Sequence, residues 1–149
     1  MNGRHIRWLV IVMVAGTLLA ACSTQPVSPD PASASDRTPE VVVESFYNWY
    51  LDYSAAGNPL VDGAYQAREE LDPRMVTRID AAMTQAGGLR ADPFLCAQDV
   101  PTYISVANEQ VASDEALVSM ESSFEGHRFK VKLVMIDEDW KIAEVMCGR

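Results

Sequence analysis

The spacing of the apolar residues changes near residue 101, and this change constrains the fold more than any other feature of the sequence. Before it, apolar side chains recur every three or four residues, as they do on one face of an α-helix. After it, they alternate with polar side chains, as in a strand with one buried and one solvated face. Helices followed by strands predict an α+β domain in which the helices pack on one face of a sheet.

The first half of the domain carries signals for three helices. Thr38-Pro39 supplies an N-cap residue and a proline for the first helical position, which predicts a helix over 39–56. A weaker pattern predicts a short helix over 63–70, and a clearer one predicts a helix over 73–86 that ends at two glycines. The residues expected on the buried faces of the first and third helices are Val43, Phe46, Tyr47, Tyr50, Leu51, Met75, Val76, Ile79, Ala82, Met83 and Ala86.

The second half predicts four antiparallel strands in a meander, joined by short turns. These strands are expected over 103–111, 116–124, 127–136 and 140–147. In the third, the apolar residues expected to face the core are Phe129, Val131, Leu133 and Met135.

Three basic residues, Arg128, Lys130 and Lys132, alternate with these apolar positions and are therefore expected on the solvent face of the sheet. One explanation is cross-strand pairing with Glu121 or Glu109. The other is that this face docks a partner, and the sequence leaves both open.

The N-terminus predicts export. Residues 1–21 have the layout of a signal peptide, in which basic residues precede an apolar run of about 14 residues, shorter than the roughly 20 that a membrane-spanning helix needs. The end of this run, Leu19-Ala20-Ala21-Cys22, resembles the lipobox of bacterial lipoproteins, which predicts cleavage before Cys22 and a lipid on its thiol. The alternative is an ordinary signal peptide that leaves Cys22 as a free thiol. In a cell with two membranes, Ser23 favours the outer membrane, with the domain facing the periplasm.

Residues 22–38 are expected to form the lipidated cysteine and a flexible tether, because the segment is rich in proline and serine and almost without apolar side chains. The single domain is then 39–149. Loss of the signal peptide removes two of the 12 basic residues and none of the 21 acidic ones, which changes the formal charge from −9 to −11. A protein with this negative charge is not expected to bind nucleic acid or to be attracted to anionic lipid. Contact with the membrane is therefore expected through the lipid anchor alone.

The number of cysteines supports the assignment of Cys22 to a lipid. With Cys22 given to the lipid, Cys96 and Cys147 remain as a pair, and a disulfide is expected in an oxidising compartment. Two buried reduced thiols are the alternative.

Three segments resemble an uncharacterised family of bacterial lipoproteins that looks related to the nuclear-transport-factor-two-like, or cystatin-like, superfamily. They are Phe46-Tyr47-Asn48-Trp49-Tyr50-Leu51, the stretch from Asp92-Pro93-Phe94 to Ala97-Gln98-Asp99-Val100-Pro101, and Trp140-Lys141-Ile142 with Val145. The resemblance implies a cone, in which a curved four-stranded sheet wraps the long first helix. Some members of that superfamily are isomerases or dehydratases and others bind partners, so the fold does not choose a function.

The only enzyme hypothesis with support in the sequence is a pocket in this cone, with Tyr47 and Tyr50 facing inwards and Asp92 or Asp99 at its mouth. An enclosed carboxyl of this kind could act as a base. The structural explanation is favoured, because tyrosines on an apolar face are usually core and Asp before Pro is a common turn pair. His127 is interpreted as a turn residue, and the sequence predicts no metal site and no cofactor.

These observations favour a membrane-anchored envelope lipoprotein that is not an enzyme and that binds another envelope protein or its own copy. A small-ligand binder that uses the cone interior is the first alternative, and an isomerase or dehydratase is the second. If the side chains of Phe46, Tyr50 and the methionines fill the interior, both pocket hypotheses lose their support.

Overall fold

The computed structural model describes residues 37–148. The expected signal peptide, Cys22 and most of the tether lie outside the described residues. In chain order the elements are α1 (Pro39–Ser54), the 3-10 helix η2 (Ala64–Ala67), α2 (Pro73–Met83), β1 (Ile104–Ala112), β2 (Glu115–Ser122), β3 (Arg128–Ile136) and β4 (Asp139–Cys147). Within the described range, neither helix has the length and apolar character needed to cross a membrane.

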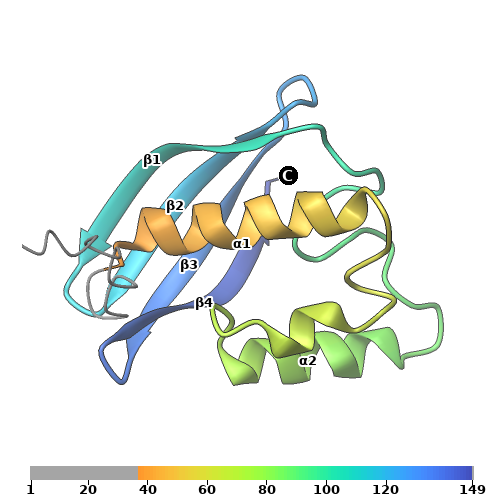
Figure 1. Cartoon of the computed structure of the whole chain (residues 1–149), viewed down its shortest axis with the longest axis horizontal. Coiled ribbons are helices and arrows are strands. Elements are labelled where there is room, and N and C mark those ends of the chain that lie inside the picture. Colours follow the sequence, from red (N-terminus) through yellow and green to blue (C-terminus); the bar gives the residue numbers. More distant parts are fainter. Residues whose placement is uncertain (1–36, 149) are drawn as a thin grey trace, which may run out of the picture.

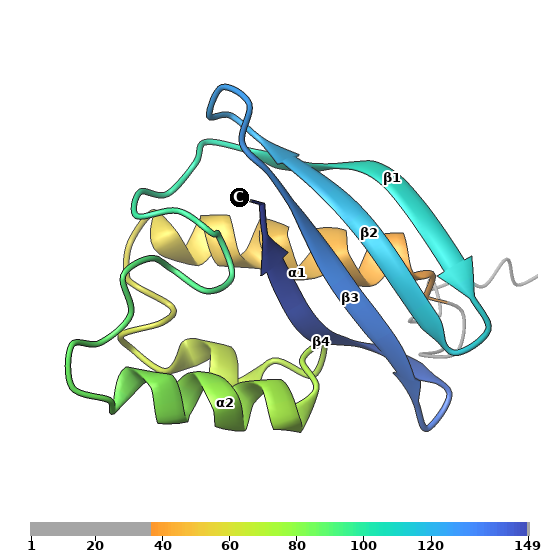
Figure 2. The same cartoon turned by 180° about the vertical axis from the view of Figure 1, so that it is seen from behind.

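The four strands form one antiparallel sheet in the order β1-β2-β3-β4, as the meander predicted. The helix α1 lies across one face of the sheet, and α2 lies beside the edge strand β4 (Figure 1). Seen from behind, the strands lie in front of α1, and no helix of the described chain covers this outer face (Figure 2). The expected α+β plan, with helices against a four-stranded antiparallel sheet, is confirmed.

The helix α1 forms as the sequence predicted. Its N-cap Thr38 accepts a hydrogen bond from the backbone N–H of Val41 through Oγ1 at 3.4 Å, and Pro39 follows at the first helical position. The helix packs its aromatic stripe on the sheet. The buried residues of α1 are Pro39, Val42, Val43, Phe46, Tyr47 and Tyr50, whereas Leu51 is only half-buried.

The helix expected over 63–70 is wrong, because only the four residues of η2 are helical there. The backbone that follows bonds across to β4 instead of along a helix. The N–H of Ile142 donates to the carbonyl of Glu70 at 2.7 Å, and the N–H of Asp72 donates to the carbonyl of Ile142 at 2.9 Å. These bonds satisfy part of the exposed edge of β4.

The helix α2 ends at Met83, three residues before the predicted end. The hydroxyl of Thr84 donates to the carbonyl of Ala81 at 2.9 Å at this end. Gly87 and Gly88 both have positive φ, at 100° and 58°, in a turn beyond the helix. The glycine pair therefore makes the turn that follows, and it does not cap the helix directly.

The core fills the space between the helices and the inner face of the sheet. Its members are Val42, Val43, Phe46, Tyr47, Tyr50, Tyr65, Leu71, Met75, Ile79, Phe94, Leu95, Ala116, Val118, Met120, Phe129, Val131, Leu133 and Ile142. The alternation predicted for β3 holds from Phe129 to Leu133 and fails at Met135, which is 36 % exposed. Met135 lies next to the β3–β4 turn, which projects beyond both helices, so neither helix covers it (Figure 1).

Candidate functional site

The two tyrosines expected to face a pocket are both part of the packed core. Tyr47 is 1 % exposed and Tyr50 is fully buried. Each hydroxyl has a partner, since Tyr47 donates to the carbonyl oxygen of Phe94 at 2.8 Å and Tyr50 donates to Oδ2 of Asp92 at 2.5 Å. Burial is the main cause that raises the pKa of both hydroxyls, so they stay protonated donors.

The Asp92 carboxylate organises the loop before β1. Its Oδ1 accepts hydrogen bonds from the backbone N–H groups of Phe94 at 2.8 Å and Leu95 at 3.1 Å, and its Oδ2 accepts from Tyr50. Burial raises the pKa of this carboxyl above its ordinary value, against the opposing effect of these hydrogen bonds. The buried tyrosines and the half-buried Asp92 thus all bond to the same loop and fix its position. Asp92 also lines a surface hollow of about 230 Å³.

The remaining pocket candidate, Asp99, is not part of that unit. Its side chain is exposed, and it makes no side-chain hydrogen bond or ion pair with another residue of the 37–148 segment. The structure therefore brings three of the four candidates together, the two tyrosines in the core and Asp92 half-buried at its edge, and leaves the fourth in solvent.

Cys96 and Cys147 form a disulfide, with an S–S distance of 2.05 Å and a Cα–Cα distance of 5.3 Å. The bond joins the Asp92 loop to the end of β4. His127 supports the same region, because its Nε2 lies 3.3 Å from the carbonyl oxygen of Cys96 and its Nδ1 lies 2.8 Å from Oγ of Ser122. The sequence placed His127 beside a turn, and the structure adds that its ring links the β2–β3 turn to the Asp92 loop.

Hollows wide enough for a ligand lie on the surface of the domain. One of about 490 Å³, which we call the sheet groove, lies on the outer face of the sheet near the ends of β3 and β4. Its lining residues are Ala107, Asn108, Ser119, Met120, Glu121, Arg128, Phe129, Lys130, Met146, Cys147 and Gly148. The β-bulge between Val106 and Asn108 lies at this hollow, because Ala107 and Asn108 are among its lining residues.

The basic row on β3 faces this outer surface, as the sequence predicted. Arg128 pairs with Glu121 across the strands at 2.7 Å, and Lys132 pairs with Glu115 at 2.7 Å. The alternative partner Glu109 is wrong, because it pairs with Val118 in register and its carboxylate turns toward α1, where it accepts from the N–H of Glu40 at 3.0 Å.

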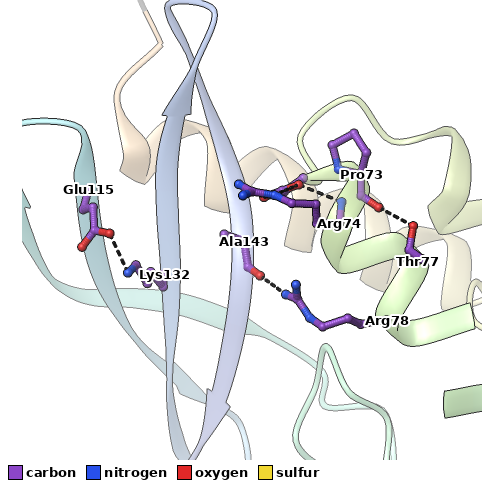
Figure 3. Close-up of polar contacts among 8 residues, drawn as sticks. Pro73, Arg74, Thr77, Arg78, Glu115, Lys132 and Ala143 are labelled. Carbon is purple, nitrogen blue, oxygen red and sulfur yellow. Dashed lines mark hydrogen bonds and ion pairs between the residues drawn. The ribbon is translucent and has the colours of Figure 1, made fainter. Parts of the chain in front are cut away.

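A second hollow of about 380 Å³, which we call the α2 depression, lies where α2 meets the edge of the same face. Its lining residues are Asp72, Arg74, Arg78, Lys132, Val134, Ala143 and Glu144. Figure 3 shows Arg78 reaching from α2 to the carbonyl oxygen of Ala143, at 2.6 Å, with Lys132 and its partner Glu115 on the neighbouring strands.

Sequence reasoning missed the two arginines of this depression. Arg74 pairs with the N-cap carboxylate of Asp72 at 2.8 Å. Burial alone would raise the pKa of Asp72, but the hydrogen bonds and charge of Arg74 outweigh it and hold that pKa below its ordinary value. The four-residue spacing of Arg74 and Arg78 shows that they share one helix face, yet only the tertiary structure places that face beside the basic row of β3.

Comparison with known proteins indicates a fold and no sequence family. No family model matches the chain, and no curated protein matches it. A chain in the crystal structure of the native type VI effector-immunity complex Tae3-Tai3 from Ralstonia pickettii is similar in structure, with a TM-score of 0.62, 22 % identity, and coverage of 75 % of this chain and 96 % of that chain. The selenomethionine form of the same complex also matches, with a TM-score of 0.62, 23 % identity, and coverage of 75 % and 98 %.

Proposed function

We propose that this chain is a lipid-anchored envelope protein that binds another protein, and that it acts as the immunity member of an effector-immunity pair. In this role the domain binds an effector that reaches the cell envelope. The lipid on Cys22 holds the domain at the membrane, and the tether of residues 22–38 gives it reach.

The observation that carries the proposal is that core side chains fill the space expected to be a pocket. The rings of Phe46 and Phe94 lie 5.2 Å apart at their centroids, and those of Tyr50 and Phe94 lie 5.3 Å apart. Both oxygens of Asp92 already accept hydrogen bonds. This arrangement supports a protein that acts through its outer surface and weakens the small-ligand and isomerase hypotheses.

The partner class rests on the structural similarity to the Tae3-Tai3 complex. Among the described residues, no group of three or more His, Cys, Asp or Glu side chains could hold a metal ion. The immunity member of such a pair needs a surface complementary to its effector and no reacting groups. This fits a domain in which Tyr47, Tyr50 and Asp92 make hydrogen bonds that fix its structure.

The proposal predicts that a cell lacking this chain becomes sensitive to the effector delivered by neighbouring cells of its parental strain. In contact with a parental strain that has an active type VI secretion system, a strain lacking the chain should fall at least tenfold in relative number. Competition on a solid surface, counted as colony-forming units, measures this. The wild-type chain should restore equal numbers, and a parental strain with inactive secretion should have no effect. Equal numbers in the first competition would contradict the proposal.

The anchor is tested separately with Cys22→Ser, which removes the thiol that would take the lipid. We expect the membrane-bound fraction to fall at least tenfold, because a chain this acidic has no electrostatic attraction to anionic lipid. Immunoblots of membrane and soluble fractions measure the distribution, and Ser23→Ala is the matched control. A Cys22→Ser protein that stays in the membrane fraction would show that the anchor is not a lipid on this residue.

A further inference from the structure

The outer face of the sheet is left uncovered within the described chain, and it holds two hollows side by side. The sheet groove lies towards the Arg128 end of β3, and the α2 depression lies further along the same strand, at Lys132 and Val134. Lys130 lines the sheet groove and Lys132 lines the α2 depression. Residues two apart in a strand lie on the same face of the sheet, so the two hollows open on the same side of β3.

Basic residues are concentrated on this face. Residues 37–148 contain nine Lys and Arg and 19 Asp and Glu. The two hollows hold five of those nine basic residues, and only three of the 19 acidic ones, Asp72, Glu121 and Glu144, line them. The basic residues are Arg74, Arg78, Arg128, Lys130 and Lys132. The other 16 acidic residues lie outside the two hollows, and one of them, Glu115, is the partner of Lys132.

Lys130 has no carboxylate partner among residues 37–148, and unlike Arg78, which donates to the carbonyl of Ala143, it makes no side-chain hydrogen bond there. It is exposed, and its neighbours in register are Ser119 on β2 and Met146 on β4, neither of which has a charge. Arg128 and Lys132 each have a carboxylate partner on β2, whereas Lys130 makes no ion pair with any residue between 37 and 148. Its ammonium group is thus available to a carboxylate from outside the chain.

We propose that the sheet groove is the docking site for an acidic segment of the partner protein, with one partner carboxylate paired to Lys130 and an apolar neighbour of that carboxylate seated against Met146 and Ala107. This rests on the proposed function and names the surface that carries it. Charge complementarity argues for an acidic segment, because such a segment is attracted to this face and repelled by the rest of the domain. A concave site of about 490 Å³ also suits inserted side chains better than a flat layer of lipid headgroups.

Photo-crosslinking in intact cells tests the site, with the photoreactive residue p-benzoylphenylalanine placed in the lipidated, full-length chain. One variant carries it at Ser119 in the sheet groove. The control carries it at Ala55, which is exposed at the end of α1 on the other side of the sheet. We expect a protein adduct from Ser119 alone, and mass spectrometry should locate it in a partner peptide that contains Asp or Glu.

Charge reversal then tests the role of Lys130. In the Ser119 variant, Lys130→Glu should lower the adduct yield at least tenfold, whereas Lys130→Arg should keep most of it. Arg90→Glu is the matched control, because it makes the same change of charge at an exposed residue outside both hollows, and it should leave the yield within twofold. Circular dichroism of each variant checks that it is folded.

The outcomes separate this inference from the proposed function. A protein adduct from Ala55 and none from Ser119 would overturn the docking site and leave partner binding intact. Adducts from Ser119 to lipid, to a second copy of this chain or to a peptide without acidic residues would overturn it too, as would an unchanged yield in Lys130→Glu. No protein adduct from either position would count against both the site and the proposed function.

Discussion

Phe46→Ala should lower the free energy of unfolding by about 3 to 5 kcal/mol, the usual loss when a buried phenylalanine is truncated. Phe46 is fully buried, and its ring centroid lies 5.2 to 5.7 Å from the ring centroids of Tyr47, Trp49, Tyr50 and Phe94. The substitution leaves a cavity and removes these aromatic contacts together. A domain of this size has a total stability of about 5 to 15 kcal/mol, so the variant should be close to unfolding.

Urea unfolding of the mature protein, followed by circular dichroism, measures this loss. The control is Val41→Ala on the same helix, because Val41 is 48 % exposed and its truncation should change stability by no more than about 0.5 kcal/mol. If Phe46→Ala cost less than about 1 kcal/mol, the centre of the core would not be packed as described, and the pocket hypotheses would regain support.

Removal of the disulfide should be nearly as costly. The double variant Cys96→Ser/Cys147→Ser opens a loop with a sequence separation of 51 residues, which the chain-entropy relation values at about 4 kcal/mol. The loss should be local as well as global, because the bond ties the Asp92 loop to the end of β4. Amide hydrogen exchange should therefore rise first in residues 92–97 and near Cys147.

A reducing agent provides the control for this experiment. It should destabilise the wild-type protein by about the same amount and leave the double variant unchanged. Thiol alkylation of the non-reduced mature protein gives an independent check. Labelling of Cys96 or Cys147 there would mean that the pair is open in the cell, and the predicted loss would then be absent.

The helices and strands were largely predictable because their signals are local. Thr38-Pro39 supplies the start of α1 from adjacent residues, and the alternation in β3 follows from the pleat of a single strand. The errors occur where distant contacts decide. The segment expected to be helical over 63–70 forms only a short 3-10 helix, because the backbone at its end hydrogen-bonds to Ile142 on β4, a partner more than 70 residues away.

The sequence predicted which residues of the candidate site come together better than it predicted what those residues do. Tyr47, Tyr50 and Asp92 do come together, but their spacing along the chain could not show that each hydroxyl and carboxylate oxygen already has a hydrogen-bond partner within the domain. Asp99 has the same chemistry as Asp92, yet it lies in solvent. The difference is the environment of each carboxyl, which depends on packing and not on residue type.

The sequence by itself determined the order of the main helices and strands and most of the buried positions on them, because these follow from periodicity and capping residues. It also gave the pairing of the two domain cysteines as one of two alternatives, from the cysteine count. The export signal and the lipid on Cys22 stay predictions. Only the tertiary structure decided that the core is filled and that Arg74 and Arg78 lie beside Lys132 on one outer face. It also decided that Lys130 has uncharged neighbours in register. Strand register and helix docking bring together residues far apart in the chain, and no local pattern encodes those distances.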